Sequence, residues 1–183
     1  MITNETLIIE KAAHIIKNKG IEELTIYNLA TELSVNVNQL YPRFTNDNDI
    51  ILMIMTAFEN ELKELGHEHI KNIEPPEIEL KLIFKKLHFL FLQKPYYLSI
   101  ILDQRLIEKN NDIKKSFFRI RNIAATYLAE IINKGKKENI FKTNESTKTL
   151  VRKILNGFRI YMQDEHILNR MVVDIVALRT IEE

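Results

Sequence analysis

The stretch that decides the fold runs from Leu24 to Phe44 and reads LTIYNLATELSVNVNQLYPRF. Its apolar residues predict two short helices joined by a tight turn. Thr25 is a suitable N-cap, and helical spacing is kept by Ile26, Leu29, Ala30 and Leu33. After a break at Ser34, Asn36 can cap a second helix with the buried positions Val37, Leu40, Tyr41 and Phe44. This is the plan of a helix-turn-helix, whose second helix lies in the major groove of DNA.

The sequence around this stretch, from Ile8 to about Ile54, resembles the N-terminal domain of TetR-type bacterial regulators. The resemblance rests on a first helix with paired alanines and a final glycine, on a Leu-Thr pair, on a hydrophobic-Ala pair, and on a Leu-Tyr-x-x-Phe motif. In this chain these are Ala12-Ala13, Gly20, Leu24-Thr25, Leu29-Ala30 and Leu40-Tyr41-Pro42-Arg43-Phe44. The resemblance implies a dimeric regulator that binds operator DNA through this head and a small ligand through its helical body.

Three residues depart from the family pattern. Ser34 stands at the turn where the family usually has glycine, and a side chain is less comfortable there if φ is positive. Pro42 removes a hydrogen bond from the second helix and is expected to shorten or kink it. Asp47 replaces a lysine that in the family contacts a DNA phosphate. Residues 46–49 are interpreted as the N-cap and first turn of the next helix, where carboxylates suit the positive end of the helix dipole.

The whole chain is predicted to be all-α, with about nine helices and no strands, because helical spacing recurs and sustained alternation does not. We expect a three-helix, homeodomain-like head over residues 1–46. Residues 47–183 are expected to form a helical-bundle body for ligand binding and dimerisation. The helices outside the decisive stretch are expected at 5–19, 47–70, 77–93, from Pro95 onward, 112–137, 146–163 and 165–181.

Composition narrows the function classes. The chain has no cysteine, so thiolate metal sites and cysteine catalysis are ruled out. Its four glycines are scattered, so there is no phosphate-binding loop, and no serine elbow or other catalytic constellation is present. His67 and His69 would point to different faces of a helix, which disfavours a metal site. We therefore expect no enzyme, cofactor, metal or membrane span, and a bacterial cytoplasmic location.

Charge is distributed unevenly along the chain. Residues 1–60 hold four basic and eight acidic side chains, a net charge of −4, whereas residues 61–183 carry +5. A DNA-binding head normally presents a basic face, because neutralising phosphates supplies much of its affinity. In this chain the expected DNA-binding head carries a net negative charge instead.

Functional residues follow from the residue types and from the family resemblance. Phosphate contacts are expected from Thr25, Tyr27, Asn28, Tyr41 and Arg43, and base contacts from Asn36, Asn38 and Gln39. An apolar ligand pocket is expected among Phe84, His88, Phe91, Tyr97, Phe117, Tyr127 and Phe158. A homodimer interface is expected along Leu150, Ile154, Phe158, Tyr161, Ile167, Met171, Ile175 and Leu178.

Three functional hypotheses remain open at this point. The first is a TetR-like regulator, in the sense of a repressor, that binds double-stranded operator DNA as a homodimer and is released by a small apolar or amphipathic ligand. The second is a TetR-like ligand- or partner-binding protein with weak or lost DNA binding, which the acidic head and Asp47 would explain. The third, a helical enzyme, is disfavoured by the missing catalytic groups.

Overall fold

The computed structural model describes residues 4–71, 74–141 and 143–161. By packing, the chain divides into two compact units, and two of the three borders between them fall inside long helices. Unit 1 comprises Met1–Asn60 with Lys94–Phe118, and unit 2 comprises Glu61–Gln93 with Arg119–Glu183. Segments distant in the sequence therefore contribute to each unit.

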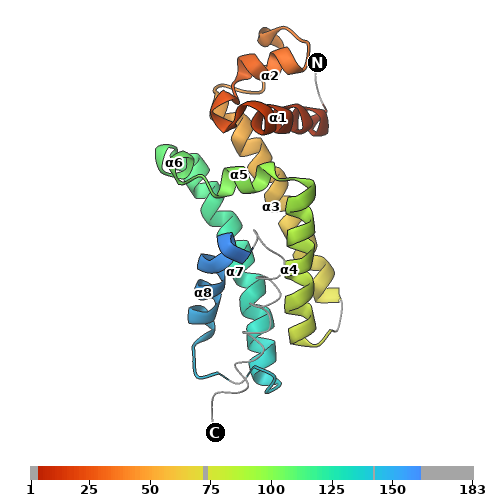
Figure 1. The fold of residues 1–183 in the computed structure, drawn as a ribbon, viewed down its shortest axis with the longest axis vertical. Helices are drawn as coiled ribbons and strands as arrows, with labels where there is room; N and C mark the ends of the chain where they lie inside the picture. The colour runs from red at the N-terminus through yellow and green to blue at the C-terminus, as the bar shows by residue number, and fades with distance from the viewer. Residues whose placement is uncertain (1–3, 72–73, 142, 162–183) are drawn as a thin grey trace. The chain divides into compact units, whose positions relative to one another are not determined.

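Every regular element in the described residues is helical, which confirms the all-α prediction. The first unit begins with α1 (Glu5–Lys19), η1 (Ile21–Glu23), α2 (Ile26–Glu32) and η2 (Val37–Gln39), where η marks a 3₁₀ helix. The remaining helices, labelled in Figure 1, are α3 (Asp47–Lys71), α4 (Pro76–Gln93), α5 (Tyr96–Ile101), α6 (Gln104–Lys109), α7 (Asn111–Lys137) and α8 (Thr147–Tyr161).

Unit 1 is built around the apolar face of α1. Asn4 caps this helix by accepting a hydrogen bond from the Leu7 N–H, and Gly20 ends it with φ of +95°. The buried residues on its inner face are Ile8, Ala12, Ile15 and Ile16. They belong to a core that also contains Leu29, Leu40, Phe44, Ile50 and Ile54. Deeper in the same unit the rings of Phe58 and Tyr97 lie 4.8 Å apart between centroids.

The turn after α2 contains a residue with positive φ at Ser34, the position where the family usually has glycine. Ser34 has φ of +56°, so it occupies the left-handed region without being glycine. The Ser34 N–H donates to the carbonyl of Thr31, and the Val35 N–H donates to the carbonyl of Ala30, both at 3.0 Å. These two bonds form a Schellman motif, which satisfies carbonyls at the end of the helix.

The second helix of the predicted pair is much shorter than a recognition α-helix. It is the three-residue η2, followed by turns in which the N–H groups of Arg43 and Phe44 both donate to the Leu40 carbonyl. The expectation that Pro42 shortens this helix is confirmed. The expectation that Tyr41 is buried is wrong, since 53% of its surface is exposed. Tyr41 lies in the turns that follow η2, so the spacing of an α-helix does not place it on the buried face with Leu40.

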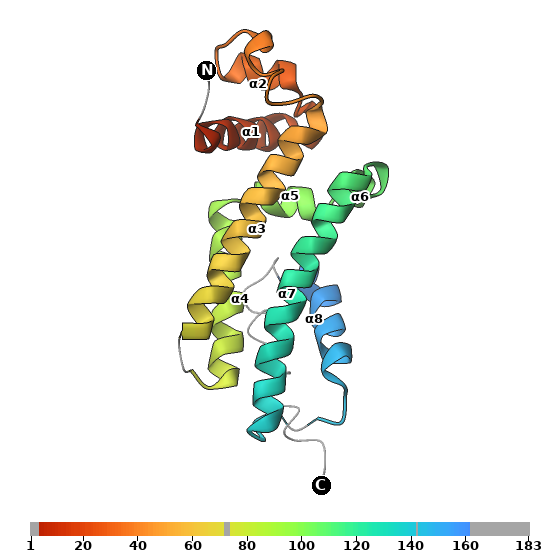
Figure 2. The same ribbon diagram turned by 180° about the vertical axis from the view of Figure 1, so that it is seen from behind.

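Unit 2 is a small helical bundle. Figures 1 and 2, which view the chain from opposite sides, both show α4 alongside α3 and α8 alongside α7. Its core includes Leu62, Leu80, Phe84, Leu87, Phe91, Leu128, Ile132 and Ile154. At the end of α7, Lys134 donates from Nζ to the Glu74 carbonyl at 2.6 Å and lies 3.3 Å from the Glu79 carboxylate. This lysine links α7 to the start of α4.

Most predicted helix limits agree with the structure to within about two residues, as expected for strongly periodic segments. The separate helix α6 was not predicted, and the predicted helix at 165–181 lies outside the described residues. The functional division at residue 46 stays a prediction, although the packing places Lys94–Phe118 in the same unit as the head. Among the helices that the structure describes, none is long and apolar enough to cross a membrane.

Replacing Ser34 by glycine should stabilise the protein. A left-handed residue with a Cβ costs about 1–2 kcal/mol, which glycine avoids. Glycine also has more conformational freedom in the unfolded chain, and this offsets part of the gain, so we expect the free energy of unfolding to rise by about 0.5–1 kcal/mol. Urea unfolding of Ser34→Gly measures it. Asn139, with the same φ of +56° in unit 2, is the matched control. Asn139→Gly should gain less, because asparagine tolerates this conformation. Equal gains at both positions would contradict the argument.

Candidate functional site

The helix-turn-helix segment presents several polar and aromatic side chains to solvent. Tyr27 is 71% exposed, Tyr41 is 53% exposed, and the exposed side chains also include Asn36, Asn38 and Gln39. Thr25 instead serves the backbone, since its Oγ1 accepts a hydrogen bond from the Asn28 N–H at 3.1 Å. An exposed tyrosine pair contributes little to folding, so these residues are available to a partner.

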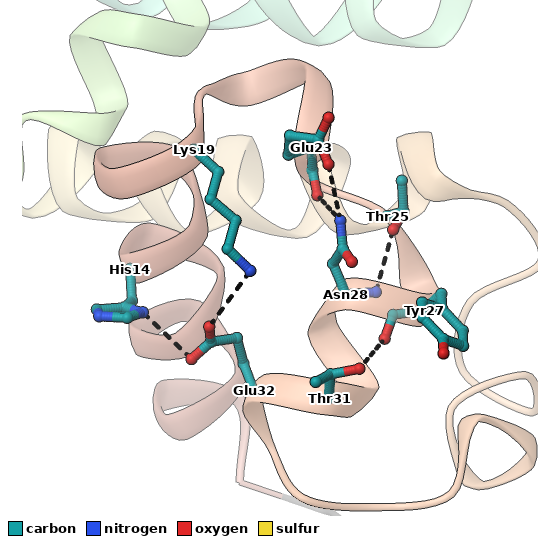
Figure 3. A network of polar contacts seen from close by, with 8 residues as sticks. All are labelled: His14, Lys19, Glu23, Thr25, Tyr27, Asn28, Thr31 and Glu32. Atoms are coloured by element: carbon teal, nitrogen blue, oxygen red, sulfur yellow. Dashed lines mark hydrogen bonds and ion pairs between the residues drawn. The ribbon is translucent and has the colours of Figure 1, made fainter.

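Asn28, predicted to contact a phosphate, is already engaged within the head. Its Nδ2 donates to the Glu23 carbonyl at 2.8 Å and to Glu23 Oε2 at 3.2 Å, as Figure 3 shows. The same view shows Thr31 donating from its hydroxyl to the carbonyl of Tyr27, at 3.0 Å. Asn28 therefore ties α2 to η1, and a phosphate would have to compete with Glu23 for its amide.

Acidic side chains also face the cations of the head. Glu32 lies 3.2 Å from His14 Nδ1 and 3.9 Å from Lys19 Nζ, which joins α2 to α1 (Figure 3). Arg43, another predicted phosphate contact, donates from Nη2 to Glu5 Oε2 at 3.0 Å. Two of the four basic residues in 1–60 are thus paired with carboxylates in the described structure.

Asp47 makes the most consequential contact of the head. Its Oδ1 accepts a hydrogen bond from the Ile26 N–H, the first amide of α2, at 2.7 Å. The interpretation of Asp47 as a cap of its own helix is incomplete, because the carboxylate reaches across to another helix start. An N-terminal amide of a helix favours an anion, so this carboxylate satisfies a group that would otherwise remain unpaired.

The start of α3 is capped by its neighbours instead. Asn46 accepts from the Asn48 N–H through Oδ1, and Asp49 Oδ2 accepts from the Thr45 hydroxyl and N–H, both at 2.6 Å. The Thr45 hydroxyl, with smaller help from the N–H groups of Thr45 and Asn46, holds the pKa of the Asp49 carboxyl below its ordinary value of 3.8, although burial opposes it. Asp49 is thus the carboxylate that closes this cap.

The sequence did not predict the acidic residues that restrain the head, namely Glu5, Glu23 and Asp47, which bond to Arg43, Asn28 and Ile26. Arg43 and Glu5 are 38 positions apart, and Ile26 and Asp47 are 21 apart. A single sequence offers no periodic signal at such separations. Only the pair of Glu23 and Asn28 is close enough in the chain to have been suspected.

Unit 2 contains a small apolar cavity between its helices. Its walls come from α3, α4, α7 and α8, and its volume is about 40 Å³. The lining residues are Leu62, Leu65, Gly66, Ile83, Phe84, Leu87, Ala124, Tyr127, Leu128, Ile154, Leu155 and Phe158. Phe158 also packs edge-on against Phe91, with ring centroids 5.7 Å apart. Among the described lining residues, the hydroxyl of Tyr127 is the only polar side-chain atom.

Comparison with known proteins shows which fold this chain has. No family model matches the chain. It is similar to the fatty acid metabolism regulator protein of Bacillus subtilis (strain 168), at 23% identity over 171 residues, which are 93% of this chain and 87% of that protein. Its structure superposes on PfmR, a TetR family transcriptional regulator from Thermus thermophilus, with a TM-score of 0.79, 18% identity and complete coverage of both chains. The chain has the TetR-family fold.

A second structure with this TetR fold contains a ligand. FadR from Bacillus subtilis, solved in complex with stearoyl-CoA, matches with a TM-score of 0.72 and 18% identity over 96% of this chain and 93% of that one.

Three of the seven residues predicted for the TetR-like ligand pocket line the cavity of unit 2, namely Phe84, Tyr127 and Phe158. Phe91 adjoins it through Phe158, and His88, also on α4, has a buried Nδ1 without a hydrogen-bond partner in the described structure. Tyr97 and Phe117 belong to unit 1, where Tyr97 packs against Phe58 and Phe117 against Phe118. The pocket as a set of seven residues stays a prediction.

The described part of the predicted dimer interface lies on α8. Leu150 is 5% exposed and Ile154 is 3% exposed, so both are buried in the core of their own chain. Phe158 lines the cavity. These three residues share one face of α8 at helical spacing, and their role in a dimer stays a prediction. The side chain of Tyr161 and the residues Ile167, Met171, Ile175 and Leu178 lie outside the described part, and their role stays a prediction.

A metal site is not found among the described residues. Among them no group of three or more His, Asp and Glu side chains could bind a metal ion. An open groove of about 480 Å³ on unit 2 is lined by both signs of charge, with residues Glu61, Glu64, Leu65, Lys85, Lys86, Phe89, Leu90 and Gln93. Its mixed lining favours no particular ligand.

Asp49→Asn should weaken the fold in a pH-dependent way. At neutral pH the loss of charged acceptors for Thr45 should cost on the order of 1 kcal/mol. Because the folded pKa lies below 3.8, this stabilisation is present above pH 3.8 and is lost as the pH falls through the folded value. Urea unfolding from pH 7 to pH 2 should show wild type and variant converging at the acidic end. A difference that stays constant with pH would refute this assignment.

Proposed function

We propose that this protein is a TetR-type transcriptional regulator, in the sense of a repressor. It binds operator DNA as a homodimer in the cytoplasm and is released by an amphipathic ligand with a long hydrocarbon chain. The observation that carries this proposal is the exposed polar and aromatic surface of the helix-turn-helix, held on a fold that matches TetR-type regulators over the whole chain. The alternatives differ in whether the head still binds DNA.

The exposed surface supports DNA binding by neutral contacts. Hydroxyl, amide and backbone N–H groups can contact phosphates without charge, and Tyr27 and Tyr41 project far enough to do so. Asn38 and Gln39 are exposed in the segment that corresponds to the recognition helix, and these residue types pair with adenine through two hydrogen bonds. Specific recognition is thus supported more strongly than high affinity.

Electrostatics supports weak binding. Glu5 neutralises Arg43 and Glu32 neutralises Lys19, so few cations are left to neutralise phosphates. Each neutralised phosphate contributes about −0.9 to the slope of log affinity against log salt. We therefore expect a shallow salt dependence. Asp47 adds a carboxylate at the first amide of α2, where it opposes an approaching phosphate.

An acyl ligand is supported by two independent facts. The cavity of unit 2 is lined almost wholly by hydrocarbon, which suits an apolar chain. The Bacillus subtilis relative is a fatty acid metabolism regulator, and the FadR structure contains stearoyl-CoA. Long-chain acyl-CoA is accordingly the proposed ligand class, with the acyl chain in unit 2.

Asp47→Asn should tighten DNA binding while weakening the fold. The amide oxygen can still accept from the Ile26 N–H, so α2 stays capped, but the repulsive charge is removed. We expect several-fold tighter binding to the DNA upstream of the protein's own gene, in gel-shift titrations at low salt. A charged hydrogen bond becomes a neutral one, so stability should fall by about 1 kcal/mol.

Glu59→Gln is the matched control for net charge. Glu59 lies twelve residues along the same helix, about 18 Å from Asp47, so ordinary salt screens its charge from that end. Binding should change little in this variant. If wild type and Asp47→Asn both fail to bind this DNA at low salt, the second hypothesis holds, and the protein is a ligand-binding relative that has lost DNA binding.

Stearoyl-CoA should release the wild-type protein from that DNA. The expected result is loss of the shifted band at micromolar stearoyl-CoA, with free coenzyme A as the control that keeps the headgroup and lacks the hydrocarbon chain. Release by coenzyme A alone, or no release by either compound, would contradict the proposed ligand class.

A further inference from the structure

The cavity of unit 2 is too small for the ligand proposed above. A volume of about 40 Å³ holds a few water molecules, whereas pockets for small organic ligands span about 300–1,000 Å³. A long acyl chain can therefore enter only if part of the wall moves. The question is which lining side chain can leave its place at least cost.

Part of the wall is fixed by its own burial. Five lining residues are at least nine-tenths buried and consist only of hydrocarbon, namely Leu62, Phe84, Leu87, Leu128 and Ile154. Moving any of them outward would expose apolar surface to water. Tyr127 is half-buried, as are Leu65, Ile83, Ala124, Leu155 and Phe158, but among the described lining residues it alone ends in a hydroxyl that water can solvate.

Tyr127 is also held loosely. Its hydroxyl donates to the Lys63 carbonyl at 3.4 Å, a long and weak hydrogen bond. Its ring lies directly on the backbone of α3 at Gly66. A Cβ on Gly66 would fall 2.0 Å from Cζ of the ring, well inside van der Waals contact. Any residue other than glycine at position 66 would force the ring out of this place.

We propose that Tyr127, seated on Gly66, is the movable stop of the cavity in unit 2 and sets the longest straight hydrocarbon chain that the cavity accepts. The ligand displaces the ring from Gly66, and the space that the ring leaves admits the end of the chain. This inference deepens the proposed function and rests on its acyl ligand, since a stop matters only where a chain enters.

A second pair in the same unit provides a matched control. A Cβ on Gly135 would fall 2.0 Å from the ring of Phe141, which lies on the backbone of α7 as Tyr127 lies on that of α3. Phe141 is buried but does not line the cavity. Substitutions in this pair should disturb packing in unit 2 without changing the size of the cavity.

The experiment measures how affinity depends on acyl length. Isothermal titration of the full chain with acyl-CoAs, from octanoyl-CoA to stearoyl-CoA and longer, keeps the headgroup constant. In the wild type each added methylene should raise affinity about fourfold until the chain meets the stop, after which affinity should level off. Tyr127→Ala should move this limit to longer chains. Gly66→Ala should also move this limit, because its methyl group would occupy the place of the ring, 2.0 Å from Cζ.

Two further variants keep the test decisive. Tyr127→Leu retains apolar packing if Tyr127→Ala does not fold, and it should also lengthen the limit. Phe141→Ala should lower the melting temperature and leave the limit unchanged. The same limit in every variant, or an equal displacement by Phe141→Ala, overturns the proposal while leaving the acyl ligand intact. Binding only after Tyr127 is shortened would support it. If no acyl-CoA binds to any variant, the proposed ligand class is wrong and this inference falls with it.

Discussion

The geometry of the head depends on one hydrogen bond, from the Ile26 N–H to the carboxylate of Asp47. It joins the first residue of α3 to the first residue of α2, and so fixes the start of the helix-turn-helix against the helix that follows it. The bond is short, charged and placed at a helix N-terminus, where a negative group is favoured. Tyr27 and Thr25 take their positions from α2, so the surface offered to a partner follows from this contact.

The same contact sets stability against DNA affinity. A carboxylate that stabilises the helix start also places a negative charge where a phosphate would approach. Glu5, Glu23 and Glu32 repeat this arrangement on Arg43, Asn28 and Lys19. In each case an acidic residue of the chain makes the hydrogen bond or ion pair that DNA could make. The negative charge of the head is therefore structural, because these carboxylates connect α1, η1, α2 and α3 to one another.

What the sequence could predict follows from the range of each interaction. Helices α1, α3, α4 and α7 were predictable because caps, prolines and helical spacing act over a few residues. The shortening at Pro42 was predictable for the same reason. The exposure of Tyr41 was not, because η2 ends at Gln39 and Tyr41 lies in the turns that follow it. The burial of Leu150 and Ile154 was also missed, since an apolar stripe looks alike whether it meets its own core or a partner.

In the candidate site, too, short-range features were predictable and long-range contacts were not. Residue types in the head and the wealth of aromatic residues in the body were visible in the sequence. The closeness of the Tyr127 ring to Gly66 was not, because it joins residues 61 positions apart and depends on the absence of a side chain. Neither an isolated glycine within a helical pattern nor a lone tyrosine is informative by itself.

The cost of empty space explains why such a cavity is small. Each cubic ångström of empty apolar volume costs about 24 cal/mol, so 40 Å³ costs about 1 kcal/mol. A vacant pocket of about 300 Å³ would cost about 7 kcal/mol, which is comparable to the whole stability of a small domain. A fold of this size is therefore more stable when one of its own side chains fills the space. A half-buried tyrosine with a polar end is suited to that task, because it contributes apolar area when inside and accepts water when displaced.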